Sequence, residues 1–313
     1  PFRIDGFEKI TTQEMTYPQP KKMGSNFFNF FTKYTGLRQL YIEKSKNGIQ
    51  WSDNQLLAAI PEKKNEKSGH YQISAQYQEK KIGTFFNRHP NGIVDRRTDL
   101  YYIESSDLGE TWNTADKQSI SIPVTEKNSP SRVEDYASLK KNIYLKDMVF
   151  DSNGRPICLY IRSNGHKPGP LSQPYEWCIT KWNGSKWTTH SITTSDHNYD
   201  MGSLLFFKKD LYLIAPTAIG PQKWGVGGEL QVWKSDDLGD HWIKENDLTH
   251  KSRMNHSYVR KSENFKAPFI FFWASGDAHQ FSKSELFFGN LNGEVWKLPY
   301  SMEKESELPQ KIE

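Results

Sequence analysis

An eight-residue pattern, Ser-x-Asp-x-Gly-x-x-Trp, occurs twice in this chain, as SSDLGETW at 105–112 and as SDDLGDHW at 235–242. Three further segments keep a Gly that follows Asn and precedes Trp by three positions: SKNGIQW at 45–51, WNGSKW at 182–187 and LNGEVW at 291–296. The five copies end at Trp residues that are about 55 to 75 residues apart. A motif that recurs at this spacing predicts an array of similar structural units.

An alternating run of apolar and polar residues leads into each copy, which is typical of a strand with one covered face. These runs are RQLYIEKS, TDLYYIES, EWCITKW, GELQVWKS and KSELFFGN. The Asp-x-Gly or Asn-Gly that follows supplies a hairpin turn. Further apolar runs precede the hairpins, as in GHYQISAQY and KIGTFFN, so each unit has about four strands. The sequence therefore predicts an all-β propeller of four-stranded blades in a single domain, 1–313, with blades at about 10–62, 68–125, 140–195, 198–250 and 253–300.

Composition agrees with this fold and limits the function. Aromatic residues make up 14% of the 313 residues while the mean hydropathy is −0.78, which suits short half-buried strands joined by polar turns. The start of the chain has no basic-then-apolar leader, and no apolar run reaches the length of a membrane span. The net charge of +4 mildly favours an anionic partner, but the basic residues are scattered, and we expect neither a nucleic-acid partner nor a membrane. Cys158 and Cys178 are too few for a disulfide framework.

In a propeller, the innermost strand of each blade starts at one mouth of the central channel, and the loop between its second and third strands returns there. These positions carry Tyr, His, Lys and Arg with few carboxylates. The candidate residues are Tyr17, Lys33, His70, Tyr71, Arg88, His89, Arg97, Tyr144, Lys146, Arg162, Tyr199, His256, Tyr258 and Arg260. Cations that hold an acidic group and rings that stack on sugars predict an anionic polysaccharide or oligosaccharide as the partner.

This set of residues suits one reaction better than others. Ordinary glycosidases use a pair of carboxylates. A uronate glycan can instead be cleaved by β-elimination, in which a cation neutralises the carboxylate and a Tyr or His moves the protons. Tyr17, Lys33, His70 and Tyr71 are the catalytic candidates, although each type of residue also has an ordinary structural role. His166, His190 and His197 lack metal-ligand spacing, so we predict no metal and no other cofactor.

Longer segments carry a family resemblance over nearly the whole chain. SGHYQIS, RHPNGIVDRRTDLYYIESSDLGETW, YLKDMVFDSNGRP, TSDHNYDMGSL, APTAIGPQ and NHSYVR together resemble the BNR-repeat family that includes ulvan lyases and rhamnosyl-glucuronate lyases. The eight-residue pattern itself resembles the Asp box of these proteins and of sialidases, a structural turn. The resemblance implies a seven-bladed propeller that cleaves at uronic acids with a His pair, an acid/base Tyr, an Arg on the carboxylate and a further Tyr. It places the first Tyr on Tyr17, the Arg on Lys33 and the further Tyr on Tyr71.

Two departures from that family pattern matter. Lys33 replaces a bidentate Arg by a point charge, which is not a neutral exchange. The resemblance also places the His pair in blades that precede PFRIDGFEKI, so five blades stand where it implies seven. The chain is then either a processed or truncated piece that lacks its N-terminal blades, or a five-bladed descendant.

Four functions remain open from the sequence. The leading hypothesis is a secreted or periplasmic, monomeric lyase acting on a rhamnose–glucuronate glycan of the ulvan type. A carbohydrate-binding propeller without catalysis is the second. A rhamnosidase would use the opposite face of the same fold. A sialidase is suggested by the Asp boxes and by PFRI near the start, but no segment resembles its Arg triad or Tyr-Glu pair.

Overall fold

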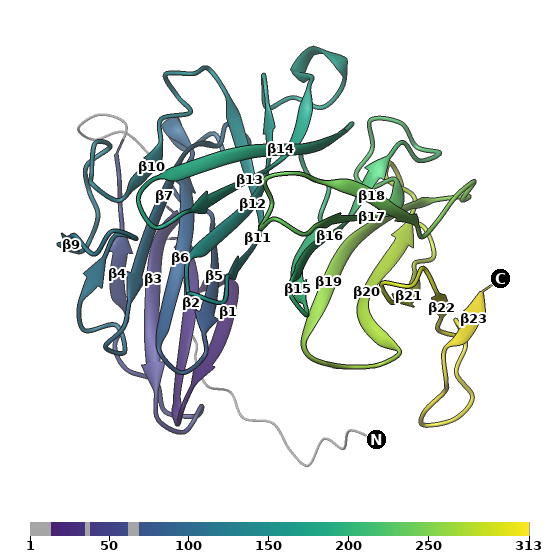
Figure 1. Cartoon of the computed structure of the whole chain (residues 1–313), viewed down its shortest axis with the longest axis horizontal. Coiled ribbons are helices and arrows are strands. Elements are labelled where there is room, and N and C mark those ends of the chain that lie inside the picture. The colour runs from purple at the N-terminus through teal and green to yellow at the C-terminus, as the bar shows by residue number, and fades with distance from the viewer. Residues whose placement is uncertain (1–13, 35–37, 62–68, 313) are drawn as a thin grey trace. The chain divides into compact units, whose positions relative to one another are not determined.

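The computed structural model describes residues 14–34, 38–61 and 69–312, and the PFRI segment lies outside them. Almost all regular structure consists of antiparallel strands (Figure 1). Five sheets follow one another along the chain, each with its strands in sequence order. The predicted all-β propeller with five blades is confirmed.

The first two blades precede residue 140. Blade one contains β1 (Met15–Met23), β2 (Asn26–Tyr34), β3 (Arg38–Ser45) and β4 (Gln55–Ala58). Blade two contains β5 (Gln72–Tyr77), β6 (Lys81–Arg88), β7 (Thr98–Ser105), β8 (Trp112–Asn113) and β9 (Ser119–Ile120), and β10 (Arg132–Glu134) pairs with β7. A short 3-10 helix, η1 (Pro90–Gly92), follows β6.

The other three blades complete the chain. Blade three has β11 (Asn142–Phe150), β12 (Pro156–Ser163), β13 (Tyr175–Trp182) and β14 (Trp187–Ser195), with η2 (Pro170–Ser172) between β12 and β13. Blade four has β15 (Ser203–Phe207), β16 (Asp210–Ala218), β17 (Glu229–Ser235) and β18 (Ile243–Asp247). Blade five has β19 (Asn255–Lys266), β20 (Phe269–Gly276), β21 (Glu285–Gly289), β22 (Val295–Lys297) and β23 (Gln310–Ile312).

The chain divides into two compact units. Among the described residues, the N-terminal unit comprises those up to Cys158 and Thr180–Thr188, and the C-terminal unit comprises Leu159–Ile179 and those from Thr189 onward. A core of buried side chains, among them Phe30, Ile42 and Trp112, fills the N-terminal unit. A second core, which includes Trp273 and Phe287, fills the C-terminal unit. The prediction of a single domain stays a prediction.

The repeated Ser-x-Asp-x-Gly-x-x-Trp pattern builds the turn after the third strand of a blade. In the first strict copy, Ser105 Oγ accepts the N–H of Gly109 at 2.8 Å, and the Asp107 carboxylate accepts the N–H of Thr111 at 2.9 Å. The second strict copy makes the same two bonds, from Gly239 to Ser235 at 2.7 Å and from His241 to Asp237 at 2.9 Å. Trp112 is buried and meets Phe30 of blade one edge-on at 6.3 Å. In both strict copies the Ser and Asp side chains thus bond within the turn, and Trp112 packs in the core of the N-terminal unit.

Candidate functional site

Aromatic and cationic side chains of the N-terminal unit gather around Tyr71, which directly precedes β5. The guanidinium carbon of Arg97 lies 3.8 Å from the centroid of the Tyr71 ring, and that of Arg38 lies 5.1 Å from it. The rings of Tyr17 and His89 both lie 5.5 Å from the Tyr71 ring. We call these five residues, Tyr17, Arg38, Tyr71, His89 and Arg97, the Tyr71 cluster. Because they come from β1, the start of β3 and the loops at the same edge of blade two, the fold rather than local sequence assembles the cluster.

Tyr17 occupies a β-bulge in β1. Thr16 pairs with Thr32 and Gln19 with Phe30, so Tyr17 and Pro18 lie opposite a single residue of β2. Tyr17 has φ of 54°, a region that residues other than Gly seldom adopt, and its side chain is 52% exposed. Bulges re-aim side chains, and strained backbone of this kind is concentrated at functional sites. The bulge therefore leaves the Tyr17 side chain half exposed while its ring contacts Tyr71.

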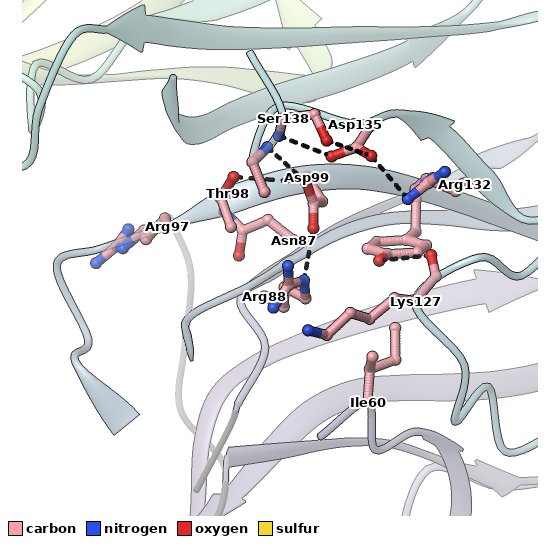
Figure 2. Close-up of polar contacts among 12 residues, drawn as sticks. Ile60, Asn87, Arg88, Arg97, Thr98, Asp99, Lys127, Arg132, Asp135 and Ser138 are labelled. Atoms are coloured by element: carbon pink, nitrogen blue, oxygen red, sulfur yellow. Dashed lines mark hydrogen bonds and ion pairs between the residues drawn. The ribbon is translucent and has the colours of Figure 1, made fainter. Parts of the chain in front are cut away.

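Arg97 is held by its own loop. Its Nε donates to the carbonyl oxygen of Val94 at 3.0 Å, and its guanidinium also lies 5.0 Å from the Tyr144 ring. Figure 2 shows the Arg97 side chain pointing away from the hydrogen-bonded network around Asp99. Contact with two rings and the bond to Val94 restrict the Arg97 side chain, and a guanidinium can bind a carboxylate bidentately.

Arg88 serves that network instead of facing a ligand. Its Nε lies 2.5 Å from the carboxylate of Asp99, and both side chains are almost fully buried (Figure 2). Asp99 also accepts the N–H of Ala137 at 2.8 Å. The ion pair joins the end of β6 to the start of β7 and so supports the backbone beside Arg97. The predicted substrate-binding role of Arg88 is not carried further, because its charge is matched internally.

His70 is a buried structural contact. Its Nδ1 lies 2.9 Å from the carbonyl oxygen of Asn87, so Nδ1 carries the proton and donates. Its Nε2 accepts the N–H of Ile60 at 3.1 Å. Burial is the main cause that lowers the pKa of His70 to about 4. With both ring nitrogens bonded and 1% of the residue exposed, His70 is not placed to exchange protons with a substrate.

His89 is buried against Tyr71 and Gly69. Neither ring nitrogen has a hydrogen-bond partner, and a Cβ on Gly69 would lie only 2.3 Å from His89 Nε2. Burial, together with the charges of His70, Arg38 and Arg97, lowers the pKa of His89 to about 3. A neutral imidazole supplies no positive charge, so His89 packs behind Tyr71 and the cations of the cluster are the two arginines.

Three other predicted residues of the N-terminal unit lie near the cluster. Lys33 pairs with Met15 in the strand register, two residues from Tyr17, and its Nζ lies 4.9 Å from the Tyr41 ring. Tyr144 is buried, and its hydroxyl donates to the carbonyl oxygen of Asp95. Lys146 is 6% exposed, with Nζ 5.8 Å from the Tyr144 ring. Lys33 is thus the more accessible of the two lysines.

The remaining predicted residues belong to the C-terminal unit. Arg162 donates from Nε to the Glu176 carboxylate at 2.9 Å, and the backbone N–H of Tyr199 donates to His197 Nδ1 at 3.0 Å. His256 is buried, with Nδ1 2.9 Å from Trp273 Nε1 and Nε2 3.0 Å from Ser252 Oγ.

Tyr258 repeats the local geometry of Tyr17 in blade five. It has φ of 59°, is 61% exposed and lies in a bulge of β19 between Ser257 and Arg260. The Arg260 guanidinium lies 5.6 Å from its ring. The same device, an exposed Tyr at positive φ in the first strand, therefore occurs in both units.

Arg38 is the member of the cluster that sequence reasoning missed. It is the first residue of the run RQLYIEKS, which predicts a strand but gives no reason to assign its first side chain to the mouth. Its carbonyl oxygen accepts the N–H of His70 at 2.8 Å, which brings the start of β3 against blade two. The signal that could have found it is its position at the start of a third strand, which lies at the same edge of the blade as the loop between the second and third strands.

Within residues 14–34, 38–61 and 69–312, no three His, Cys, Asp or Glu side chains come together as a possible metal site. Over the same residues, no helix has the length and apolar character needed to cross a membrane.

Fold and cluster together define a BNR-type β-propeller that carries an aromatic and cationic site. The model of the BNR repeat-containing family matches residues 5–195, and the chain belongs to this family. A search of curated protein sequences found no match.

Solved structures share the fold at low sequence identity. An ulvan lyase is 15% identical with a TM-score of 0.74, over 93% of this chain and 68% of that chain. The same figures hold for an ulvan lyase structure bound to -[GlcA(1-4)Rha3S]-. Another polysaccharide lyase is 14% identical with a TM-score of 0.62, over 88% of this chain and 58% of that chain. A Trypanosoma rangeli sialidase is 9% identical with a TM-score of 0.51, over 91% of this chain and 52% of that chain.

Proposed function

We propose that this protein is a polysaccharide lyase that cleaves a glucuronate-containing, ulvan-like glycan by β-elimination. The observation that carries the proposal is the Tyr71 cluster, in which two guanidinium groups flank one Tyr and a second, exposed Tyr lies beside it. Positive charge for a carboxylate and a hydroxyl for proton transfer are what the elimination needs. The likeness to an ulvan lyase bound to a glucuronate–rhamnose sulfate repeat supports this choice of substrate class.

Arg97 and Arg38 would bind the C6 carboxylate of the uronate. Neutralising that carboxylate acidifies the C5 hydrogen, because it stabilises the negative charge that develops when the proton leaves. Family resemblance assigned the carboxylate to Lys33 alone. In this chain the guanidinium groups of Arg38 and Arg97 suit a planar carboxylate better than an ammonium does, so Lys33 would add a third positive charge near Tyr17.

Tyr17 would act as the acid/base residue, and Tyr71 would orient the sugar. In the elimination, the C5–H bond breaks and its electron pair forms the C4–C5 double bond. The Tyr17 oxygen, in its deprotonated form, would take the C5 proton and then return it to the leaving O4. The C4–O4 bond breaks at the same time, and the leaving oxygen takes up a proton. No water is consumed, and the product is an unsaturated uronate at the new non-reducing end.

The direct test is to incubate the protein with ulvan and follow the ultraviolet absorbance of the unsaturated uronate. Tyr17→Phe keeps the ring and its contact with Tyr71 but removes the hydroxyl, so product formation should fall at least about a hundredfold. Tyr77→Phe is the matched control, because Tyr77 is another partly exposed Tyr of the N-terminal unit, whose hydroxyl donates to the carbonyl oxygen of Ser152. Absence of product from ulvan and other uronate glycans would sink the proposal.

A carbohydrate-binding propeller without catalysis is the second candidate. The observation that favours it is that His70 has both nitrogens bonded and His89 is buried and neutral, so neither is placed as a proton acceptor. This function predicts that ulvan binds wild type and Tyr17→Phe equally and that no product accumulates. Either function implies a secreted or periplasmic location, where such a polysaccharide is met.

The two glycosidase alternatives have less support. The sialidase is 9% identical, and the similarity concerns the fold alone. The PFRI segment, which suggested a sialidase, lies outside the described residues. A rhamnosidase would release rhamnose without an unsaturated uronate, so the same incubation distinguishes it.

A further inference from the structure

The C-terminal unit contains a separate pocket of about 770 Å³ between the segment that follows β18 and one face of blade five. Its volume lies within the usual range for small-molecule sites. The polar residues of the Tyr71 cluster belong to the other unit and take no part in it. Nothing in the proposed chemistry uses this pocket.

The pocket has an apolar floor. Leu248, Phe287 and Val295 line it and are each less than 10% exposed. Phe287 and Val295 lie on the same face of blade five, since Phe287 pairs with Lys297 and Val295 with Ile312, which also line the pocket. A floor of this kind accepts the C–H face of a sugar ring without leaving polar groups unpaired.

The rim of the pocket combines a ring with charges. Tyr300 is 59% exposed, and Lys283 Nζ lies 4.8 Å from its ring. Lys297 and Glu285 form a half-exposed ion pair at 3.1 Å. Arg253, also exposed, adds a further positive charge. An exposed ring with a cation beside it can stack on a sugar and bind its acidic group, while an ion pair offers both donors and acceptors to hydroxyls.

We propose that this pocket is an ancillary binding site for one or two residues of an acidic polysaccharide, with Tyr300 as the stacking platform and Lys283 on the anionic group. The choice of an acidic polysaccharide rests on the proposed function, whereas the existence of the pocket does not. Such a site would hold the polymer independently of cleavage and would raise the local concentration of chain at the protein.

Affinity electrophoresis in gels that contain ulvan tests this site without requiring catalysis. Tyr300→Ala and Lys283→Ala should each bind ulvan roughly threefold to tenfold more weakly than wild type. Lys209→Ala is the matched control, since Lys209 is an exposed lysine of the same unit at the turn between β15 and β16, and it should migrate as wild type does. Unchanged mobility of both Tyr300→Ala and Lys283→Ala would overturn the inference.

Two further arms identify the ligand and separate this inference from the lyase proposal. Ulvan that has been desulfated or carboxyl-reduced shows which acidic group is bound, and undiminished binding of both modified polymers would contradict an anionic ligand. Loss of binding in Tyr300→Ala without any unsaturated product from wild type would support this site while refuting the lyase. Product from wild type with unchanged binding in both variants would do the reverse.

Discussion

The Arg97 guanidinium carbon lies 3.8 Å from the centroid of the Tyr71 ring, at stacking distance, while Nε of the same side chain donates to Val94. Two anchors therefore hold one positive charge at a defined place. Such preorganisation means that little side-chain freedom is lost when an anion binds. The neighbouring Arg96 is exposed and is not among the residues whose contacts with Tyr71 define the cluster.

Replacing Arg97 should weaken recognition of the uronate. A charge-assisted hydrogen bond contributes about 1.5–3 kcal/mol, so Arg97→Ala should lower kcat/KM on ulvan, or ulvan affinity, roughly ten- to hundredfold. Arg97→Lys should recover little of this loss, because an ammonium neither stacks on Tyr71 nor binds a carboxylate bidentately. Arg96→Ala removes the same charge at the adjacent residue, and it should behave as wild type. Equal effects of Arg96→Ala and Arg97→Ala would show that only bulk charge matters.

Tyr17→Gly should separate stability from function. The positive φ at Tyr17 costs roughly 1–3 kcal/mol, while the edge contact with Tyr71 contributes about 0.5–1.5 kcal/mol. The variant should therefore unfold in urea at the same or a higher concentration than wild type while losing lyase activity. Tyr77→Gly is the comparison, because Tyr77 contacts Phe150 without a positive φ. It should lose about 1 kcal/mol or more, and a similar loss in Tyr17→Gly would contradict strain at the bulge.

The sequence predicted blades well because each blade is encoded locally. Alternating strands and the turn bonds of Ser105 and Asp107 involve residues a few positions apart, so a pattern can reveal them. The sequence predicted the members of the Tyr71 cluster less well. Arg38 contacts Tyr71, which is 33 residues further along the chain, and a pattern of neighbouring residues does not predict such a contact. Conversely, Arg88 and His70 have side chains that could bind a substrate or transfer a proton. Each is instead bonded to a buried partner, and only the packing of the folded chain brings that partner into place.

Breaking the buried Arg88–Asp99 ion pair should lower the free energy of unfolding substantially. Asp99→Asn keeps the shape and tolerates the positive φ of 57° at this position, but leaves the buried guanidinium without its countercharge. Breaking such a pair costs about 3–5 kcal/mol in the free energy of unfolding. Glu110→Gln removes the exposed pair with Lys44, which lies at 2.7 Å, and should cost less than about 1 kcal/mol. Urea unfolding of both variants checks the contrast, and equal losses would mean that the Arg88 charge is relieved by another route.

The repeated turn should matter for folding and not for the reaction. Ser105→Ala removes the acceptor of the Gly109 N–H and the donor to Asp107, which should cost about 1–2 kcal/mol. Ser235→Ala should cost a similar amount, since the second strict copy makes the same bonds. Ulvan binding and kcat/KM, measured well below the unfolding temperature, should stay at wild-type values. A specific loss of kcat at unchanged stability would instead give the pattern a catalytic role.

Acid should destabilise the N-terminal unit through its two buried histidines. Burial lowers the pKa of His70 to about 4 and that of His89 to about 3, from an ordinary value of 6.5. As the pH falls below about 6.5, these two histidines are protonated in the unfolded chain but stay neutral in the folded chain. Their contribution to stability is therefore fully present above this pH and is lost as the pH falls towards the folded pKa values. His89→Leu removes one of these protons and an imidazole without hydrogen-bond partners. It should match wild type within about 1 kcal/mol at pH of about 7.5 and exceed it by about 2 kcal/mol at pH of about 5. The carboxylates contribute equally to wild type and His89→Leu, so they cancel in the difference between the two free energies of unfolding. If urea unfolding gave parallel curves of this free energy against pH, His89 would be protonated in the folded protein, and the prediction would be wrong.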